Sequence, residues 1–129
     1  MNSAPDVEIY VANINTEAAQ KWLNSVFQVV AVMPKRKGMP KNATSFKVSW
    51  ERNEFTVMVF EQAVKGYTSL WFDSPRLPWN NDSECATQAA AFYNKGVRVT
   101  AGGWEDTADP DAWIEVSPNG DVKQLIWKT

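Results

Sequence analysis

The chain has 129 residues, of which 44% are hydrophobic and 22% are charged, and its formal net charge is −2. This length and composition predict one compact globular domain that spans residues 1–129. The charge disfavours binding to nucleic acid, which needs a broad basic surface, and no apolar stretch approaches the ~20 residues that cross a bilayer.

Three residue counts restrict the chemistry further. Histidine is absent from the sequence, which removes the usual general base and excludes Ser-His-Asp and Cys-His catalysis. The single cysteine, Cys85, excludes an internal disulfide, and we expect an inert thiol because no basic neighbour is evident. Tryptophan occurs seven times, and it both packs cores and lines ligand pockets.

The N-terminal residues suggest the location and the first two elements. They carry neither a charged nor an apolar leader region, so no signal peptide is expected and the cytoplasm is the default location. Residues 7–14 begin with alternating apolar and polar side chains and predict a strand. Asn15 and Thr16 offer an N-cap for a helix over 17–27, whose apolar residues recur at helical spacing.

Three strands are expected in the remainder of the first half. A Val-rich strand at 28–33 leads into a basic loop at 34–42. The segments 44–51 and 54–63 predict a hairpin. Apolar side chains lie on both faces of the second of these strands, which indicates a central strand covered on both sides.

The second half repeats the pattern, starting with a strand at 67–72. A loop rich in turn-forming residues occupies 73–81, and Asp82 or Ser83 is the expected N-cap of a helix that runs to about Asn94.

Three more strands close the chain. A strand at 97–101 precedes an acidic loop at 102–110. The segment 111–127 then predicts a hairpin around the turn Ser117-Pro118-Asn119-Gly120, because proline presets a turn and Asn-Gly supplies positive φ.

Each half therefore reads β-α-β-β-β, in modules of about 6–63 and 67–128. This order resembles the vicinal oxygen chelate superfamily, which contains glyoxalases, bleomycin-resistance proteins and extradiol dioxygenases. The segment 7–27 (VEIYVANINTEAAQKWLNSVF) resembles the opening strand and helix of that family, and 116–125 (VSPNGDVKQL) resembles its closing hairpin.

The resemblance implies an α+β fold. Two modules would form curled antiparallel or mixed sheets around a ligand or metal, with a helix on the outer face of each sheet. The alternative is a single antiparallel sheet with both helices on one face, which would remove the argument for a shared cavity.

Carried over residue by residue, the resemblance places Glu8 at the opening-strand ligand position. Gln124 stands where the closing hairpin normally has glutamate, and Glu61 is a looser match. Without any imidazole these oxygen ligands make a poor transition-metal site, so no metal, cofactor or catalytic residue is expected. Metal-free relatives that hold ligands on aromatic side chains suit this sequence better.

Five residues are candidates for ligand binding, and each has a structural alternative. Glu8 is expected either to line a cavity or to lie on a solvated strand face. Gln124 is expected either to line a cavity or to form a cross-strand hydrogen bond. Trp71 lines a pocket or belongs to the core. Trp79 and Trp104 lie in polar loops, where an indole plugs the fold or contacts a partner.

The first functional hypothesis is a homodimeric protein that binds or sequesters a small aromatic or planar ligand without catalysis. The second is a protein-interaction module, similar to an immunity protein or inhibitor, that uses the loop tryptophans and the acidic loop. The third is a metal-dependent lyase or dioxygenase.

Overall fold

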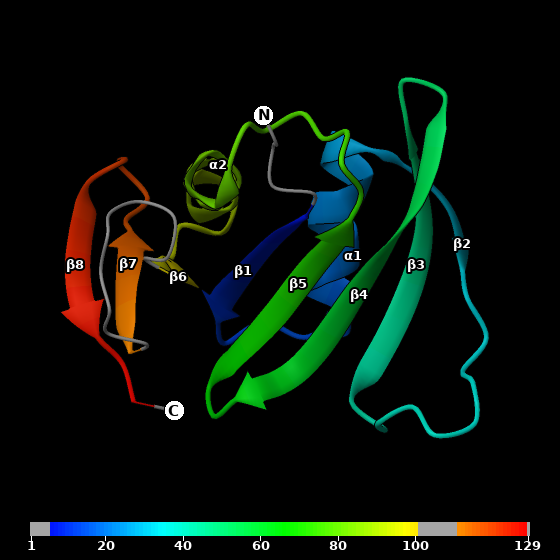
Figure 1. Ribbon diagram of the computed structural model, residues 1–129, viewed down its shortest axis with the longest axis horizontal. Helices are drawn as coiled ribbons and strands as arrows, with labels where there is room; N and C mark the ends of the chain where they lie inside the picture. Colours follow the sequence, from blue (N-terminus) through cyan, green and yellow to red (C-terminus); the bar gives the residue numbers. More distant parts are fainter. Residues whose placement is uncertain (1–5, 101–110, 129) are drawn as a thin grey trace.

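A single antiparallel sheet forms the body of the protein (Figure 1). The computed structural model describes residues 6–100 and 111–128. In these ranges eight strands follow the order β2-β3-β4-β5-β1-β6-β7-β8, and each pair of neighbours is antiparallel. With two helices beside this sheet, the α+β class is confirmed.

The strands lie close to the segments that the sequence predicts. Their bounds are β1 (Val7–Ala12), β2 (Gln28–Val32), β3 (Ala43–Trp50), β4 (Asn53–Val64), β5 (Tyr67–Asp73), β6 (Val97–Thr100), β7 (Ala112–Val116) and β8 (Val122–Ile126).

The helices begin at asparagine caps. In α1 (Thr16–Val26), the Asn15 side chain accepts the Ala18 N–H at 2.8 Å, as expected. In α2 (Asp82–Tyr93), however, Asn81 is the cap, and its Oδ1 accepts the Glu84 N–H at 2.9 Å. The predicted cap at Asp82 or Ser83 is wrong because extended backbone at Asn81 already directs its side chain at the first turn.

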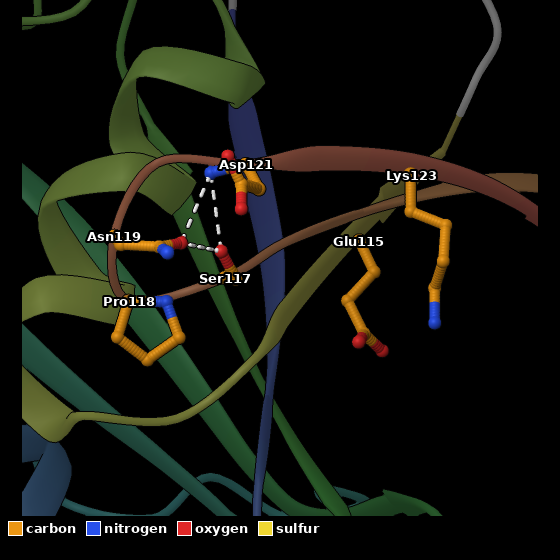
Figure 2. Close-up of a pocket in the computed structure, with 6 residues that line it drawn as sticks. All are labelled: Glu115, Ser117, Pro118, Asn119, Asp121 and Lys123. Carbon is orange, nitrogen blue, oxygen red and sulfur yellow. Dashed lines mark hydrogen bonds between the residues drawn. The ribbon is translucent and has the colours of Figure 1, made fainter.

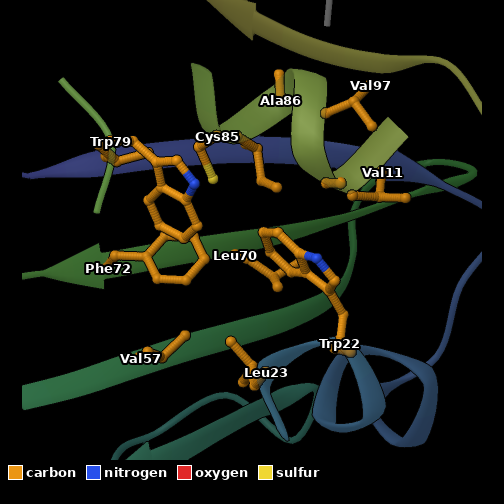
Figure 3. Packing of buried hydrophobic residues seen from close by; sticks show 14 of the residues in the cluster. Val11, Trp22, Leu23, Val57, Leu70, Phe72, Trp79, Cys85, Ala86 and Val97 are labelled. Carbon is orange, nitrogen blue, oxygen red and sulfur yellow. The ribbon is translucent and has the colours of Figure 1, made fainter. Parts of the chain in front are cut away.

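Both helices pack on the same face of the sheet. The Tyr93 hydroxyl of α2 donates to the Ala18 carbonyl of α1 at 2.8 Å. Beneath them, Trp22 of α1 stacks on Trp79, with ring centroids 5.8 Å apart and planes at 17° (Figure 3). The small residues of α2, among them Ala86, are fully buried and let this helix lie close to the strands.

The segment that was expected to open a second module, β5, instead lies inside the sheet between β4 and β1. Only Lys65 and Gly66 separate β4 from β5, and Gly66 has φ +83°. Such a short connection makes the two strands an antiparallel hairpin. The strands of both halves therefore share one sheet that is not closed into a barrel, as in the alternative arrangement, and the argument for a cavity between two modules falls away.

The strand β4 is covered by helices on one face only. Phe55, Val57 and Val59 are buried beneath the helices. Met58 and Phe60 point to the opposite face and are half-buried. We call this opposite side of the sheet the helix-free face. In the described ranges no helix is both long and apolar enough to span a membrane.

Candidate functional site

The helix-free face carries a groove that is bounded by the sheet and by the connection between β2 and β3. The groove has a volume of about 280 Å³, and we call it the Trp71 groove. Its lining residues are Met33, Pro34, Arg36, Met39, Ser45, Thr56, Met58, Trp71 and Asp73. The connecting loop that the sequence marks as basic and exposed therefore forms one wall of the groove.

Hydrogen bonds fix the two largest sheet residues of the groove. The Trp71 Nε1–H donates to Asp6 Oδ2 at 2.6 Å, which sets the plane of the indole. The Ser45 hydroxyl donates to the Met58 sulfur at 2.9 Å. Met58 and Trp71 are opposite each other in the β4–β5 register, so thioether and indole form a continuous surface.

Two side chains of opposite charge line the same groove. Arg36 comes from the connecting loop, and Asp73 ends β5. The loop also contains Lys35, Lys37 and Lys41, so its overall charge is positive. The groove thus combines an aromatic wall with one basic and one acidic side chain, beside a loop whose overall charge is positive.

Farther along the helix-free face, four aromatic rings and one arginine form a second feature. We call it the aromatic patch, and it consists of Tyr10, Tyr67, Arg98, Trp113 and Trp127. The Trp127 ring lies 4.7 Å from both Trp113 and Tyr67 by ring centroid, and Tyr10 lies 5.2 Å from Trp113. Edge-to-face and tilted contacts of this kind are favourable beyond simple burial.

Arg98 is held rigidly within the patch. Its guanidinium carbon lies 4.5 Å from the Trp127 ring centroid and 5.0 Å from that of Tyr67. Its Nε donates to Glu115 Oε1 at 2.9 Å. Cation–π contacts and a charge-assisted hydrogen bond together fix the arginine, so its position is established before any ligand arrives.

Glu8 lies between the groove and the patch. It is opposite Trp71 in the β1–β5 register, and it accepts a hydrogen bond from the Tyr10 hydroxyl at 3.4 Å. Partial burial raises the pKa of the Glu8 carboxyl, and the nearby Asp6 raises it further, while the bond from Tyr10 lowers it. The structure therefore brings the predicted site residues Glu8 and Trp71 together.

Asp82 belongs to the same acidic neighbourhood. Burial raises its pKa to about 6, a backbone hydrogen bond from Glu8 lowers it, and the charges of Asp6 and Glu8 raise it. The hydrogen bond occupies part of the β1 edge that the short strand β6 leaves unpaired. Asp82 thus joins the first turn of α2 to the sheet.

The other predicted site residues lie elsewhere. Gln124 is opposite Ile114, which is buried under α2, so Gln124 points to the helix side of the sheet, whereas Glu8 is on the helix-free face. Gln124 is exposed on the edge strand β8. The structure does not bring these two residues together.

Of the two loop tryptophans that the sequence singles out, the structure describes Trp79 and not Trp104. Trp79 is 7% exposed, and its Nε1–H donates to Gln88 Oε1 at 2.6 Å, so it is a core residue, although it also lines a surface hollow together with Trp50. Trp104 and the acidic loop lie outside the described residues.

Glu61 and Cys85, which the sequence also singles out, lie outside the Trp71 groove. In the described ranges, no group of three carboxylate or thiol side chains could hold a metal ion. Glu61 accepts the Thr16 N–H at 2.6 Å, and this bond lowers the pKa of its carboxyl. Complete burial raises the pKa of Cys85 well above its ordinary value.

A second hollow lies at the turn of the closing hairpin (Figure 2). Ser117, Asn119 and Asp121 bond to one another across the turn. All the residues that line this hollow belong to the β7–β8 hairpin, so it has no opposite wall. The Trp71 groove is bounded by separate segments and is the better candidate site.

Comparisons with protein-family models, with known proteins and with solved structures found no match for this chain. The resemblance to the vicinal oxygen chelate superfamily therefore remains a prediction from the residues.

The sequence reasoning did not single out Met58 or the aromatic patch. The alternation of side chains along β1, β5 and β7 contains a signal, since Tyr10, Tyr67 and Trp113 occupy polar-face positions of their strands. The register of the strands is needed to show that these rings meet.

Proposed function

We propose that the protein binds a small planar ligand in the Trp71 groove. One observation carries this proposal: an indole held by Asp6 stands beside Met58 in a groove that has a second wall from another segment. Ligand sites combine apolar and aromatic walls with a few oriented polar groups, and this groove has both.

The size of the groove limits the ligand. About 280 Å³ is at the lower end of the volumes that hold small molecules, so a molecule of one or two fused rings is the expected occupant. The basic loop around Arg36 favours a ligand with a negative substituent. Asp73 at the end of β5 opposes this preference, so the expected selectivity between charges is modest.

The test uses two probes with the same ring system and opposite charge, naphthalene-2-carboxylate and 2-naphthylmethylamine. Each is titrated into ¹⁵N-labelled protein, and the indole N–H signal of Trp71 is followed by NMR. We expect this signal to shift with both probes, and the carboxylate to bind more tightly. Unchanged signals from all groove residues at saturating probe would contradict the proposal.

A matched pair of variants locates the binding site. Trp71→Leu removes the stacking surface and should weaken binding about three- to tenfold. Trp50→Leu makes the same change at the end of β3, outside the groove, and should leave the affinity unchanged. Equal effects of both variants would show that the response does not come from the groove.

A second candidate function is binding of a protein partner at the aromatic patch. Partly exposed Tyr, Trp and Arg side chains are typical of interface hot spots, and Arg98 is already ordered. Capture experiments with Trp127→Ala and with Phe92→Ala, an exposed ring on α2, distinguish the surfaces. A partner that Trp127→Ala retains would eliminate the patch as its contact surface.

A further inference from the structure

The edge strand β8 exposes two large apolar side chains. Val122 is 51% exposed and Ile126 is 56% exposed, and Gln124 lies between them on the same face. In the described ranges β8 has a strand neighbour on one side only, which is β7. Exposed apolar residues on an unpaired edge are the features that favour strand addition.

The hydrogen-bond pattern shows which residues present their backbone to the outside. The Trp127 N–H donates to the Asp111 carbonyl at 2.8 Å, and the Ser117 N–H donates to the Asp121 carbonyl at 2.9 Å. In an antiparallel pair the backbone groups of successive residues point alternately inward and outward. The N–H and C=O groups of Val122, Gln124 and Ile126 therefore point away from β7.

From this arrangement we propose that β8 pairs with β8 of a second copy, antiparallel and centred on Gln124. In this register Gln124 meets its own equivalent, and Val122 meets Ile126 of the second copy on each side. All three pairs are of the hydrogen-bonded type and exchange two bonds each. An isologous contact of this kind requires a self-complementary surface, which β8 supplies.

The side chains also suit this register. Lys123 would lie opposite Leu125 of the second copy, so no like charges are directly opposed. Val122 and Ile126 would form β-branched cross-strand pairs, which are favourable on a sheet surface.

The other edge of the sheet is less suited to pairing. In β2 the register shifts between Val29 and Ala31, which marks a bulge or irregularity, and Pro34 follows the strand closely. Bulges and prolines are devices that prevent edge-to-edge pairing. β2 also exposes a large apolar side chain, Val32 at 56%, but its irregular register and the following proline interrupt the edge, so we select β8 as the site of association.

The expected dimer is weak, because one five-residue strand pair is small for a protein interface. Sedimentation velocity over a concentration series should show a species of 14.5 kDa at low concentration and twice this mass at high concentration. A monomer at every concentration would overturn the proposal.

Substitutions at Gln124 separate this interface from any other. Gln124→Pro removes a donor that points outward, so the monomer should fold normally while the dimer is lost. Gln124→Ala retains the backbone donor and should retain the dimer. A dimer that is unaffected by Gln124→Pro would show that a different surface is responsible.

Cysteine trapping gives an answer even if the proline variant does not fold. Gln124→Cys should form an intermolecular disulfide on mild oxidation, because facing residues in such pairs lie about 5.5 Å apart at Cα. The native Cys85 is buried and does not compete. Lys123→Cys is the control, since it faces Leu125 of the second copy, and equal trapping of both variants would refute the register.

Discussion

Replacement of Trp79 tests whether this loop tryptophan belongs to the core. The indole is 7% exposed and contacts three other rings, with centroid distances of 5.8 Å to Trp22, 5.0 Å to Phe72 and 5.7 Å to Phe27. A buried tryptophan removes about 150–250 Å² from water, which corresponds to about 4–6 kcal/mol. We therefore expect Trp79→Ala to lower the free energy of unfolding by about 4 kcal/mol.

For a chain of this length, a loss of about 4 kcal/mol corresponds to a fall in melting temperature of about 15 °C. Urea and thermal unfolding followed by circular dichroism measure both quantities. Trp79→Phe keeps a ring but loses the hydrogen bond to Gln88, and it should cost about 1–2 kcal/mol.

Trp71→Ala is the matched control, because this indole is half-exposed on the helix-free face. This substitution should lower the free energy of unfolding by about 1–2 kcal/mol. If Trp79→Ala lowers stability by less than about 1 kcal/mol, or by less than Trp71→Ala does, the assignment of Trp79 to the core is refuted.

Three further predictions concern charge and reactivity. Because the pKa of Asp82 is raised to about 6 in the folded state, its ionisation should destabilise the fold as pH rises from about 4 to about 6. Asp82→Asn should remove this pH dependence of stability, which urea unfolding at a series of pH values measures. At pH 7 the substitution should raise the free energy of unfolding by about 1 kcal/mol, a value reduced for solvent screening of the partly exposed carboxyl. Arg98→Met leaves Glu115 without its cation and should lower the free energy of unfolding by about 2 kcal/mol, measured by urea unfolding. Glu115→Gln should lower it by less than about 1 kcal/mol. Equal losses from the two variants would argue against the ion pair. The buried thiol of Cys85 should react with Ellman's reagent only in molecules that have opened or unfolded, and rapid labelling of the native protein would contradict its burial.

Local chemistry was sufficient to predict the elements. The helical spacing of apolar residues in α1 and the cap at Asn15 depend on contacts within a few residues, and both are confirmed. The turn at Ser117–Gly120 is likewise set by its own residues, with Gly120 at φ +91°.

The order of the strands in the sheet and the residues that form the candidate site could be determined only from the tertiary structure. The sequence alone places Glu8 and Gln124 on strands, but which face of a strand meets a helix depends on residues far away in the chain. Period-2 alternation assigns side chains to two faces without saying which face is covered. The register of the strands placed Glu8 and Gln124 on opposite faces, and packing of both helices on one face left Trp71 on the other, where the groove lies.

The Lys65-Gly66 link and Trp79 show the same difference between what the sequence indicates and what the tertiary structure decides. The link at Lys65-Gly66 is a boundary between similar segments in the sequence, whereas in space it is a hairpin turn that merges both halves into one sheet. The residues next to Trp79 in the sequence are polar and predict an exposed loop. In the structure, however, its indole packs against the rings of Trp22 and Phe72 in the core. Local propensity determined the helices, strands and turns, and long-range burial of apolar surface decided how they meet.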